Sequence, residues 1–499
     1  MAPGLPGAGD LVLAAGAGVT GLPVVRYLAA RGARVVVTAD RAAPPELASI
    51  PGDVVFAGAL GAPPPGTTLV VTSAGIPPSD ALLTAAAATG IPVIGEVELA
   101  WRIDREATLG APRPWLVITG TNGKTTTTGM LESILRTGGH DVRACGNIGW
   151  PVLEAVLAGG PQESAPTGSG AVGEPPGRQS VIAVELSSFQ LHWAPSLRPA
   201  AGVVLNLAED HLDWHGSMAA YGHDKARALS GDVALAVVDD PGAAALLARS
   251  PAARTVPIGS GPPPAGGLGV VDDVLTDRAW ADPARALARA DQVHPPGAHN
   301  VTNALAAAGL ALAVGVEPTA VAAGLAAFAP GGHRNVLVAT RAGVSYVDDS
   351  KATNPHAALA SLLAYPRVVW VAGGQLKGAS VDELVLAVRD RLAGVVLLGV
   401  DAPMIHAAVS RHAPDVPVLP VPGTDDVVMR SVVSAAARMA APGDVVLLAP
   451  AAASLDMFSS YAARGKAFAA AALDLPDGAD LPDSADLPDS ADRSGSIGS

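Results

Sequence analysis

The sequence predicts an α/β protein of three domains, each built on a mainly parallel sheet. Short apolar strands alternate with alanine-rich helical stretches over residues 10–108, and the same alternation returns after residue 331. Between these regions, an apolar strand at residues 115–119 leads directly into a Gly-Lys-Thr turn and a helix. The length of 499 residues is sufficient for about three domains of ordinary size.

Composition and charge exclude several classes of protein. A single cysteine, Cys145, excludes a disulfide framework and fits a reducing cytosol. No uncharged apolar run reaches the roughly 18 residues that cross a bilayer, and no basic segment precedes the first apolar stretch. The net charge of −14 argues against nucleic-acid binding. We therefore expect a cytoplasmic protein without membrane insertion, monomeric by default.

Residues 1–110 are expected to form the first domain. Strands are predicted at residues 11–14, 34–38, 68–73 and 92–94. The turn at residues 16–21 has the spacing G-x-G-x-x-G, and Asp40 follows the second strand, as in a Rossmann-like dinucleotide-binding domain. On these residues alone, a nicotinamide cofactor and a UDP-sugar both remain open as ligands.

The second domain is expected over residues 111–330, after a linker marked by Pro112 and Pro114. Its Gly-Lys-Thr turn predicts a loop in which backbone N–H groups, a helix N-terminus and Lys124 surround a polyphosphate. The generic spacing fails, because Ile118 stands where that pattern has glycine. Residues 159–180 are rich in Gly, Pro, Ser and Glu and lack periodicity, so we expect a disordered insertion there.

Polar residues follow the apolar strands of this second domain. Glu185 comes directly after the strand at 181–184, and His211 lies in a polar segment after the strand at 201–205. Ser217 is the expected N-cap of a helix that carries Lys225. Without further context, a histidine such as His211 is more often an ordinary loop residue, and a lysine such as Lys225 is normally a solvated surface charge. Asn300 and Asn303, three residues apart, share one face of a helix.

The third domain is expected over residues 331–473, after the sequence Pro-Gly-Gly at 330–332. Strands are predicted at 368–372, 394–398 and 445–448. Thr353, Lys377 and Ser454 are donors of the kinds that bind carboxylates, although on these residues alone a solvated lysine and two helix caps are the favoured explanation. Aspartates recur every third residue from Asp474 onward, which predicts a disordered acidic tail over 474–499.

The phosphate loop in its shorter form, Thr-Gly-Thr-Asn-Gly-Lys-Thr-Thr, resembles the ATP loop of the Mur ligases, which join an amine to a carboxylate. Matching motifs follow in the family's order from about residue 10 to residue 470. The resemblance implies an ATP-dependent amide ligase with a central P-loop ATPase-type domain between two Rossmann-like domains. It implies that ATP is bound by Gly120, Thr121, Asn122, Gly123, Lys124, Thr125, Thr126, Asn300, Asn303, Arg334 and Asp349.

A UDP-sugar is the ligand that the resemblance implies for the first domain, in preference to NAD. The family's Ser-Pro-Gly turn stands here as Ser-Ala-Gly at residues 73–75. The implied contacts of the UDP-linked substrate are Gly18, Val19, Thr20, Asp40, Ser73, Gly75 and Asn147.

Two magnesium ions are also implied by the resemblance. Their ligands would include Thr125, Glu185, His211 and Lys225, the last as a carbamate formed with carbon dioxide. A carbamate turns an ammonium into a carboxylate-like anion, which a hard cation accepts as a ligand. Lys124, Glu185, His211 and Lys225 are the implied catalytic residues.

The run Asp-Ser-Lys-Ala-Thr-Asn at residues 349–354 resembles the D-glutamate-adding members of the family. The implied substrates are therefore UDP-N-acetylmuramoyl-L-alanine and D-glutamate, which are joined in peptidoglycan precursor synthesis. A family ligase for a different amino acid, and a nucleotide-binding protein without catalysis, remain as alternatives. The implied D-glutamate contacts are Lys351, Thr353, Lys377, Ser454, Leu455 and Tyr461.

Overall fold

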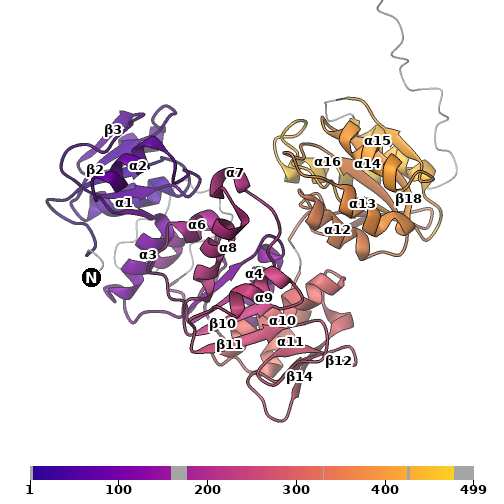
Figure 1. Cartoon of the computed structure of the whole chain (residues 1–499), viewed down its shortest axis with the longest axis horizontal. Coiled ribbons are helices and arrows are strands. Elements are labelled where there is room, and N and C mark those ends of the chain that lie inside the picture. Colours follow the sequence, from indigo (N-terminus) through magenta and orange to yellow (C-terminus); the bar gives the residue numbers. More distant parts are fainter. Residues whose placement is uncertain (1–3, 159–176, 330, 424–427, 477–499) are drawn as a thin grey trace, which may run out of the picture. The chain divides into compact units, whose positions relative to one another are not determined.

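The predicted α/β class with three sheets is confirmed in a computed structural model of the chain (Figure 1). The structure describes residues 4–158, 177–329, 331–423 and 428–476. The chain divides into two compact units, Met1–Pro330 and Gly331–Ser499, which are treated separately below.

The N-terminal sheet is parallel, with the strand order β3-β2-β1-β4-β5. Strands β1 and β4 are neighbours in the sheet but are not consecutive in the chain, so the strand order reverses between them. The loop after β1 lies at this switch point, which is the usual position for a ligand in such sheets. The strands are β1 (Leu11–Ala15), β2 (Arg34–Thr38), β3 (Val54–Gly58), β4 (Thr67–Thr72) and β5 (Val93–Gly95), and the helices are α1 (Gly21–Ala30), α2 (Ala81–Ala88) and α3 (Glu96–Arg105).

The central sheet has the order β14-β13-β12-β11-β10-β9-β6-β8-β7, parallel from β7 to β12 and antiparallel beyond. Helix α4 follows the phosphate loop and packs against α10 and α11 (Figure 1). The strands are β6 (Trp115–Thr119), β7 (Cys145–Gly146), β8 (Ile182–Glu185), β9 (Ala201–Val204), β10 (Val233–Val237), β11 (Arg254–Ile258), β12 (Leu268–Val271), β13 (Val274–Asp277) and β14 (Arg285–Arg289). The helices are α4 (Lys124–Thr137), α5 (Val152–Leu157), α6 (Ser188–His192), α7 (Leu212–His215), α8 (Met218–Ala226), α9 (Pro241–Leu247), α10 (Ala298–Ala313) and α11 (Pro318–Ala327).

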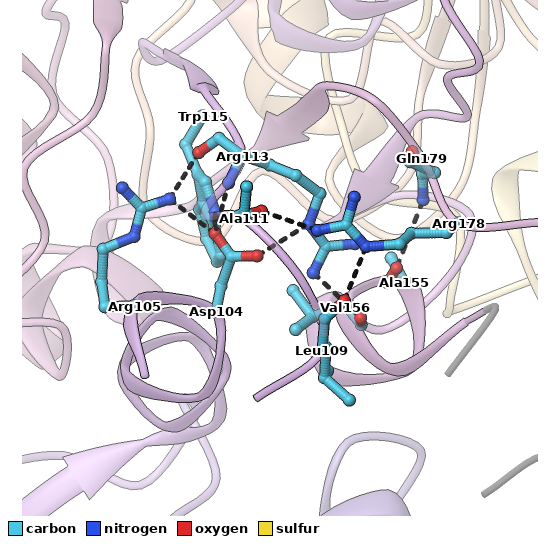
Figure 2. A network of polar contacts seen from close by, with 10 residues as sticks. All are labelled: Asp104, Arg105, Leu109, Ala111, Arg113, Trp115, Ala155, Val156, Arg178 and Gln179. Carbon is cyan, nitrogen blue, oxygen red and sulfur yellow. Dashed lines mark hydrogen bonds and ion pairs between the residues drawn. The ribbon is translucent and has the colours of Figure 1, made fainter. Parts of the chain in front are cut away.

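The predicted linker between these two sheets is a packed junction (Figure 2). Arg113 is 2% exposed, and its Nε donates to Asp104 at 2.7 Å while its Nη2 donates to the Val156 carbonyl at 2.9 Å. The indole of Trp115 donates to the same Asp104 carboxylate at 3.1 Å and its ring meets Trp101 edge to face. Helix α3 therefore shares one hydrophobic core with the first strand of the central sheet.

The expected insertion at 159–180 is wrong at its C-terminal end, and the rest of it, residues 159–176, lies outside the described residues. Gln179 is fully buried and accepts a hydrogen bond from the Arg143 backbone at 2.9 Å. Arg178 donates to the carbonyls of Leu109 and Ala111 at 2.8 and 2.6 Å (Figure 2). The polar side chains of Arg178 and Gln179 thus satisfy backbone groups at and next to the junction.

The C-terminal sheet has the order β15-β16-β20-β17-β18-β19, with only the β15–β16 pair antiparallel among its described strands. Alternate residues of β17 enter two different cores, one on each face, which explains why this strand is continuously apolar. The strands are β15 (Val336–Arg341), β16 (Val344–Asp348), β17 (Val368–Gly373), β18 (Leu392–Leu398), β19 (Val418–Pro420) and β20 (Val445–Leu448), and the helices are α12 (Pro355–Leu363), α13 (Asp382–Val388), α14 (Ala402–His412), α15 (Val428–Met439) and α16 (Tyr461–Leu473).

Most of the expected acidic tail lies outside the described residues, which end at Pro476. Its first residue, Asp474, is described and lies 3.6 Å from the guanidinium of Arg430. In the described ranges, no helix combines the length and the apolar character that crossing a membrane requires.

Candidate active site

The phosphate loop is shaped by two glycines. After the fully buried strand β6, Gly120 has φ 152° and Gly123, the N-cap of α4, has φ 83°. A side chain at Gly123 would lie 2.6 Å from Oδ1 of Asn303, so the position has no room for a Cβ atom. Asn303 in turn donates to Asn300 at 3.1 Å, and both are buried. The structure thus brings the two asparagines together and places Asn303 against the loop.

Asn206, two residues after the end of β9, fixes the tip of this loop. Its side chain accepts from the Asn122 backbone at 2.8 Å, and its carbonyl accepts from Thr121 at 3.1 Å. The Thr121 hydroxyl lies 3.0 Å from the Tyr221 hydroxyl on α8. Neither Asn206 nor Tyr221 is among the residues that sequence reasoning assigned to the site, although both lie in motifs that it singled out.

Lys124 and Lys225 share one acceptor. Each ammonium donates to the Gly120 carbonyl at 2.8 Å, and Lys124 also donates to the Thr121 carbonyl at 2.9 Å. Lys225 is 1% exposed, so the alternative of a solvated surface lysine is wrong. Burial and the charge of Lys124 lower the pKa of Lys225 well below its ordinary value, opposed in part by Asp210 and Glu185. This environment favours the neutral amine.

Glu185 is the last residue of β8 and is 1% exposed. Oε1 accepts from the Asn147 side chain at 2.9 Å, and the Glu185 carbonyl accepts from the Asn147 backbone at 2.8 Å. Oε2 is buried without a hydrogen-bond partner in the described part of the chain. A buried carboxylate oxygen that lacks a donor fits a cation ligand.

His211 lies at the start of α7 with φ 53°, a left-handed conformation. Its side chain is 48% exposed, 3.4 Å from Asp210 and packed on the ring of Phe189. Thr125 lies in the first turn of α4, directly after Lys124. Among the described residues, no three His, Cys, Asp or Glu side chains form a ready-made metal site.

A network of hydrogen-bonded polar side chains next to Lys225 joins α6, α7 and α8. Asp224, adjacent to Lys225, accepts from His192 at 2.9 Å and from His215 at 3.1 Å. The other ring nitrogen of His215 lies 2.9 Å from the Ser188 hydroxyl, and burial lowers the pKa of His215. Sequence reasoning missed this network, because nothing in the spacing of these residues indicates that they meet.

The loop after β1 lines a pocket in the N-terminal domain. Gly16, with φ 103°, lies so close to Ser73 that a Cβ atom would overlap the serine side chain. Thr20, Ser73 and the buried Glu96 are among the lining residues. Val19, at 74% exposure, and Asp40 point to solvent. Sequence reasoning missed Glu96, whose pKa is raised by burial to about 7.

Gly75 is contacted by the central domain. The indole nitrogen of Trp214, in α7, donates to the Gly75 carbonyl at 3.2 Å. The Trp214 ring also packs on Phe189, 4.7 Å between centroids. The loop expected to hold the UDP-sugar and the segment that follows His211 are therefore in direct contact.

In the C-terminal unit, the expected D-glutamate residues follow the carboxyl ends of β16, β17 and β20. The Lys351 ammonium lies 3.9 Å from the centroid of the Tyr461 ring. Lys377 is exposed with φ 53°, whereas Ser454 is 4% exposed. Two backbone hydrogen bonds between Gln375 and Ala453 hold the loops of Lys377 and Ser454 side by side.

Other expected residues of this unit lie close by. Thr353 follows Lys351, and its backbone donates to the Lys351 carbonyl at 2.8 Å. Leu455 is 66% exposed. Asp349 accepts from Asn335 and Ser361, and burial raises its pKa to about 7 although Arg334 opposes the shift.

Comparison with known proteins agrees with this arrangement. Three family models match the chain. Residues 10–95 match the model "Mur ligase MurD-like, N-terminal domain", residues 118–311 match "Mur ligase middle domain", and residues 333–452 match "Mur ligase, glutamate ligase domain". The fold and the phosphate loop define a three-domain α/β protein whose central domain carries a loop of the kind that binds polyphosphates. The chain belongs to the Mur ligase family, as its phosphate loop predicted.

Similar proteins extend over nearly the whole chain. The UDP-N-acetylmuramoylalanine–D-glutamate ligase of Rhodococcus jostii (strain RHA1) is 51% identical over 487 residues, covering 92% of this chain and 94% of the relative. The protein of that name from Mycolicibacterium smegmatis (strain ATCC 700084 / mc(2)155) is 52% identical over 502 residues, covering 94% and 97%. A crystal structure of MurF from Acinetobacter baumannii is similar in fold, with a TM-score of 0.54, 17% identity, and coverage of 89% of this chain and 87% of that one.

Proposed function

We propose that this chain is the ATP-dependent ligase that joins D-glutamate to UDP-N-acetylmuramoyl-L-alanine in cytoplasmic peptidoglycan precursor synthesis, acting as a monomer. The observation that carries the proposal is the 51% identity, over 92% of the chain, to a relative whose name states these two substrates. The phosphate loop and the donor groups at the C-terminal strand ends supply the chemistry that such a reaction requires.

In the first step, the L-alanyl carboxylate of the UDP-linked substrate attacks the γ-phosphorus of ATP. The bond from that phosphorus to the β–γ bridging oxygen breaks, and ADP leaves an acyl phosphate behind. Lys124 and the loop N–H groups stabilise the charge that develops on the phosphoryl oxygens. Asn147, hydrogen-bonded to Glu185, is suited to contact the substrate next to the acidic group.

In the second step, the D-glutamate amine attacks the acyl carbon, loses a proton and displaces phosphate through a tetrahedral intermediate. D-glutamate carries two carboxylates, and Lys351, Lys377 and Ser454 offer ammonium and hydroxyl donors for them. The loop Gly18-Val19-Thr20 and the pocket beside Ser73 are proposed to bind the UDP end of the other substrate.

Magnesium would be held by Thr125, Glu185, His211 and a Lys225 carbamate, and when bound it would neutralise phosphate charge. Oε2 of Glu185, which is buried without a hydrogen-bond partner among the residues that the structure describes, supports the proposed ligand role. Burial lowers the pKa of Lys225, which makes the neutral amine easier to form; this amine would form the N–C bond with carbon dioxide as the nitrogen loses a proton. The carbamate oxygens would then replace the ammonium beside Glu185 and Lys124.

A phosphate-release assay with ATP, UDP-N-acetylmuramoyl-L-alanine and a panel of amino acids tests the proposal. We expect release to require all three substrates, with D-glutamate preferred over L-glutamate, D-alanine and diaminopimelate. Preference for another amino acid would identify a different ligase of the family. Release independent of the amino acid would overturn the proposed reaction.

A further inference from the structure

Arg464, on the first turn of α16, is a buried cation at the centre of the C-terminal unit. Its side chain is 1% exposed, and burial lowers its pKa to about 10. No carboxylate of the described residues lies within ion-pair distance of the guanidinium, although Asp456 and Asp348 attract it from farther away. A buried charge without an ion pair costs stability unless hydrogen bonds compensate for lost hydration.

Backbone carbonyls at three separate strand ends, together with one serine hydroxyl, supply those hydrogen bonds. Nε donates to the Ser350 hydroxyl at 2.9 Å, and Nη2 donates to the Ser350 carbonyl at 3.0 Å. Nη1 donates to the carbonyls of Gly373 and Ala452, each at 3.2 Å. Nη2 also reaches Ala452, at 3.1 Å. One planar guanidinium therefore contacts the ends of β16 and β17 and the loop after β20.

These three loops carry the groups proposed to bind D-glutamate. Lys351 directly follows Ser350, Lys377 lies four residues after Gly373, and Ser454 lies two residues after Ala452. The Ser350 hydroxyl in turn donates to the Tyr461 carbonyl at 2.8 Å. The glycine after Arg464 permits this arrangement, because a Cβ atom at Gly465 would overlap His333 and lie 2.7 Å from Asp348.

We propose that Arg464 is a positioning residue for D-glutamate, which sets the relative placement of the three strand-end loops through the fixed fork of its guanidinium. It does not contact the substrate, since it is buried beneath the loops. Lysine cannot replace Arg464. Its three N–H donors lie on a single nitrogen, whereas the guanidinium spreads its donors over three nitrogens in one plane and so reaches acceptors in separate loops. The identity of the ligand rests on the proposed function, whereas the coupling of the loops does not.

Steady-state kinetics of the full-length Arg464→Lys variant test the inference. We expect the KM for D-glutamate to rise at least about tenfold, and those for ATP and the UDP-linked substrate to stay within about twofold, because only the D-glutamate loops lose shared contacts. Arg113→Lys is the matched control, since Arg113 is equally buried at the junction of the other unit. It should lower Tm without changing the KM for D-glutamate.

Hydrogen exchange gives a second measurement that does not depend on the substrate. In Arg464→Lys, amides of residues 349–354, 373–378 and 451–456 should all exchange faster, whereas in Arg113→Lys they should not. If Arg464→Lys does not fold, Ser350→Ala, which removes one acceptor, should produce a smaller rise in the same KM. An unchanged D-glutamate KM, an equal rise for all substrates, or faster exchange in only one loop would overturn the proposal. Failure of the wild-type protein to use D-glutamate would instead overturn the proposed function.

Discussion

The side-chain amide of Asn147 donates a 2.9 Å hydrogen bond to Oε1 of Glu185 and leaves the buried Oε2 of that carboxylate without a partner among the described residues. The expected consequence is that Glu185→Gln keeps its fold but loses a cation ligand. Because the glutamine side chain keeps an oxygen that can accept from Asn147, Tm should change little, while phosphate release should fall at least about a hundredfold.

Activity titrated with magnesium, together with calorimetry, checks this prediction. Glu98→Gln is the matched control, because Glu98 is also fully buried but bonds to Arg102 and Ser196. That variant should lose stability and keep its magnesium dependence. A fully active Glu185→Gln enzyme would remove Glu185 from the proposed ligand set.

Replacement of Lys225 distinguishes a carbamate from a simple cation. Lys225→Ala should lose most activity, and added acetate or formate should restore part of it by supplying an anionic oxygen to the vacated position. Lys225→Arg keeps the positive charge but cannot form the carbamate, so it should be as inactive as the alanine variant. Labelled bicarbonate should give a carbamate carbon signal by NMR in the wild-type protein and in neither Lys225 variant.

Lys466 provides the control for that experiment, since it is exposed on α16. Its replacement by alanine or arginine should change neither activity nor the carbamate signal. Near-normal turnover of Lys225→Arg would show that the residue acts as a cation.

The phosphate-loop lysine is expected to affect chemistry rather than folding. Lys124 donates to the carbonyls of Gly120 and Thr121 and is only partly buried. Lys124→Ala should therefore reduce phosphate release below about a hundredth of wild type, because the lost ammonium acts on developing phosphoryl charge. Tm should change little. Higher residual turnover would contradict the assignment of this loop.

Glu96 predicts a dependence of stability on pH. Burial raises its pKa from 4.5 to about 7, so the folded protein retains this proton to higher pH than the unfolded chain. The contribution of Glu96 to the free energy of unfolding is complete below the unfolded pKa of 4.5, and it is lost as the pH rises toward the folded pKa of about 7. Glu96→Gln should thus gain stability relative to wild type on going from about pH 5 to about pH 8, by up to roughly 3 kcal/mol.

Calorimetry of both proteins at the two pH values measures this difference. Glu46→Gln, at an exposed glutamate of the same domain, should show no such change. A difference in Tm between Glu96→Gln and wild type that does not vary with pH would contradict the prediction.

The sequence was sufficient for the phosphate loop and for several strands of continuous apolar residues, although the equally apolar β10 was not among the predicted strands. Residues 34–38 form β2 as predicted, and Ser217 caps α8 through a hydrogen bond from Ala220. The antiparallel strands β12 to β14 were not predicted, because they are short and interrupted by glycine and charged residues. Local pattern carries little information about such strands, whose pairing depends on tertiary contacts.

Burial of individual charged residues was the main feature that sequence reasoning could not supply. Arg464 and Lys466 are two residues apart on α16, yet one is buried and the other exposed. Lys225 likewise looks like a surface charge until α8 is packed against the phosphate loop. Which face of a short helix turns inward depends on the rest of the fold.

The junction around Arg113 has a practical consequence for labelling the protein. The carbonyl of Val156 and the side chain of Arg178, on either side of residues 159–176, are both hydrogen-bonded to the junction. The register of β8, and with it the position of Glu185, is therefore set by contacts outside that stretch. An affinity peptide or a fluorescent reporter inserted between Ala158 and Gly177 should therefore leave Glu185 in place, which would allow the protein to be followed in living cells.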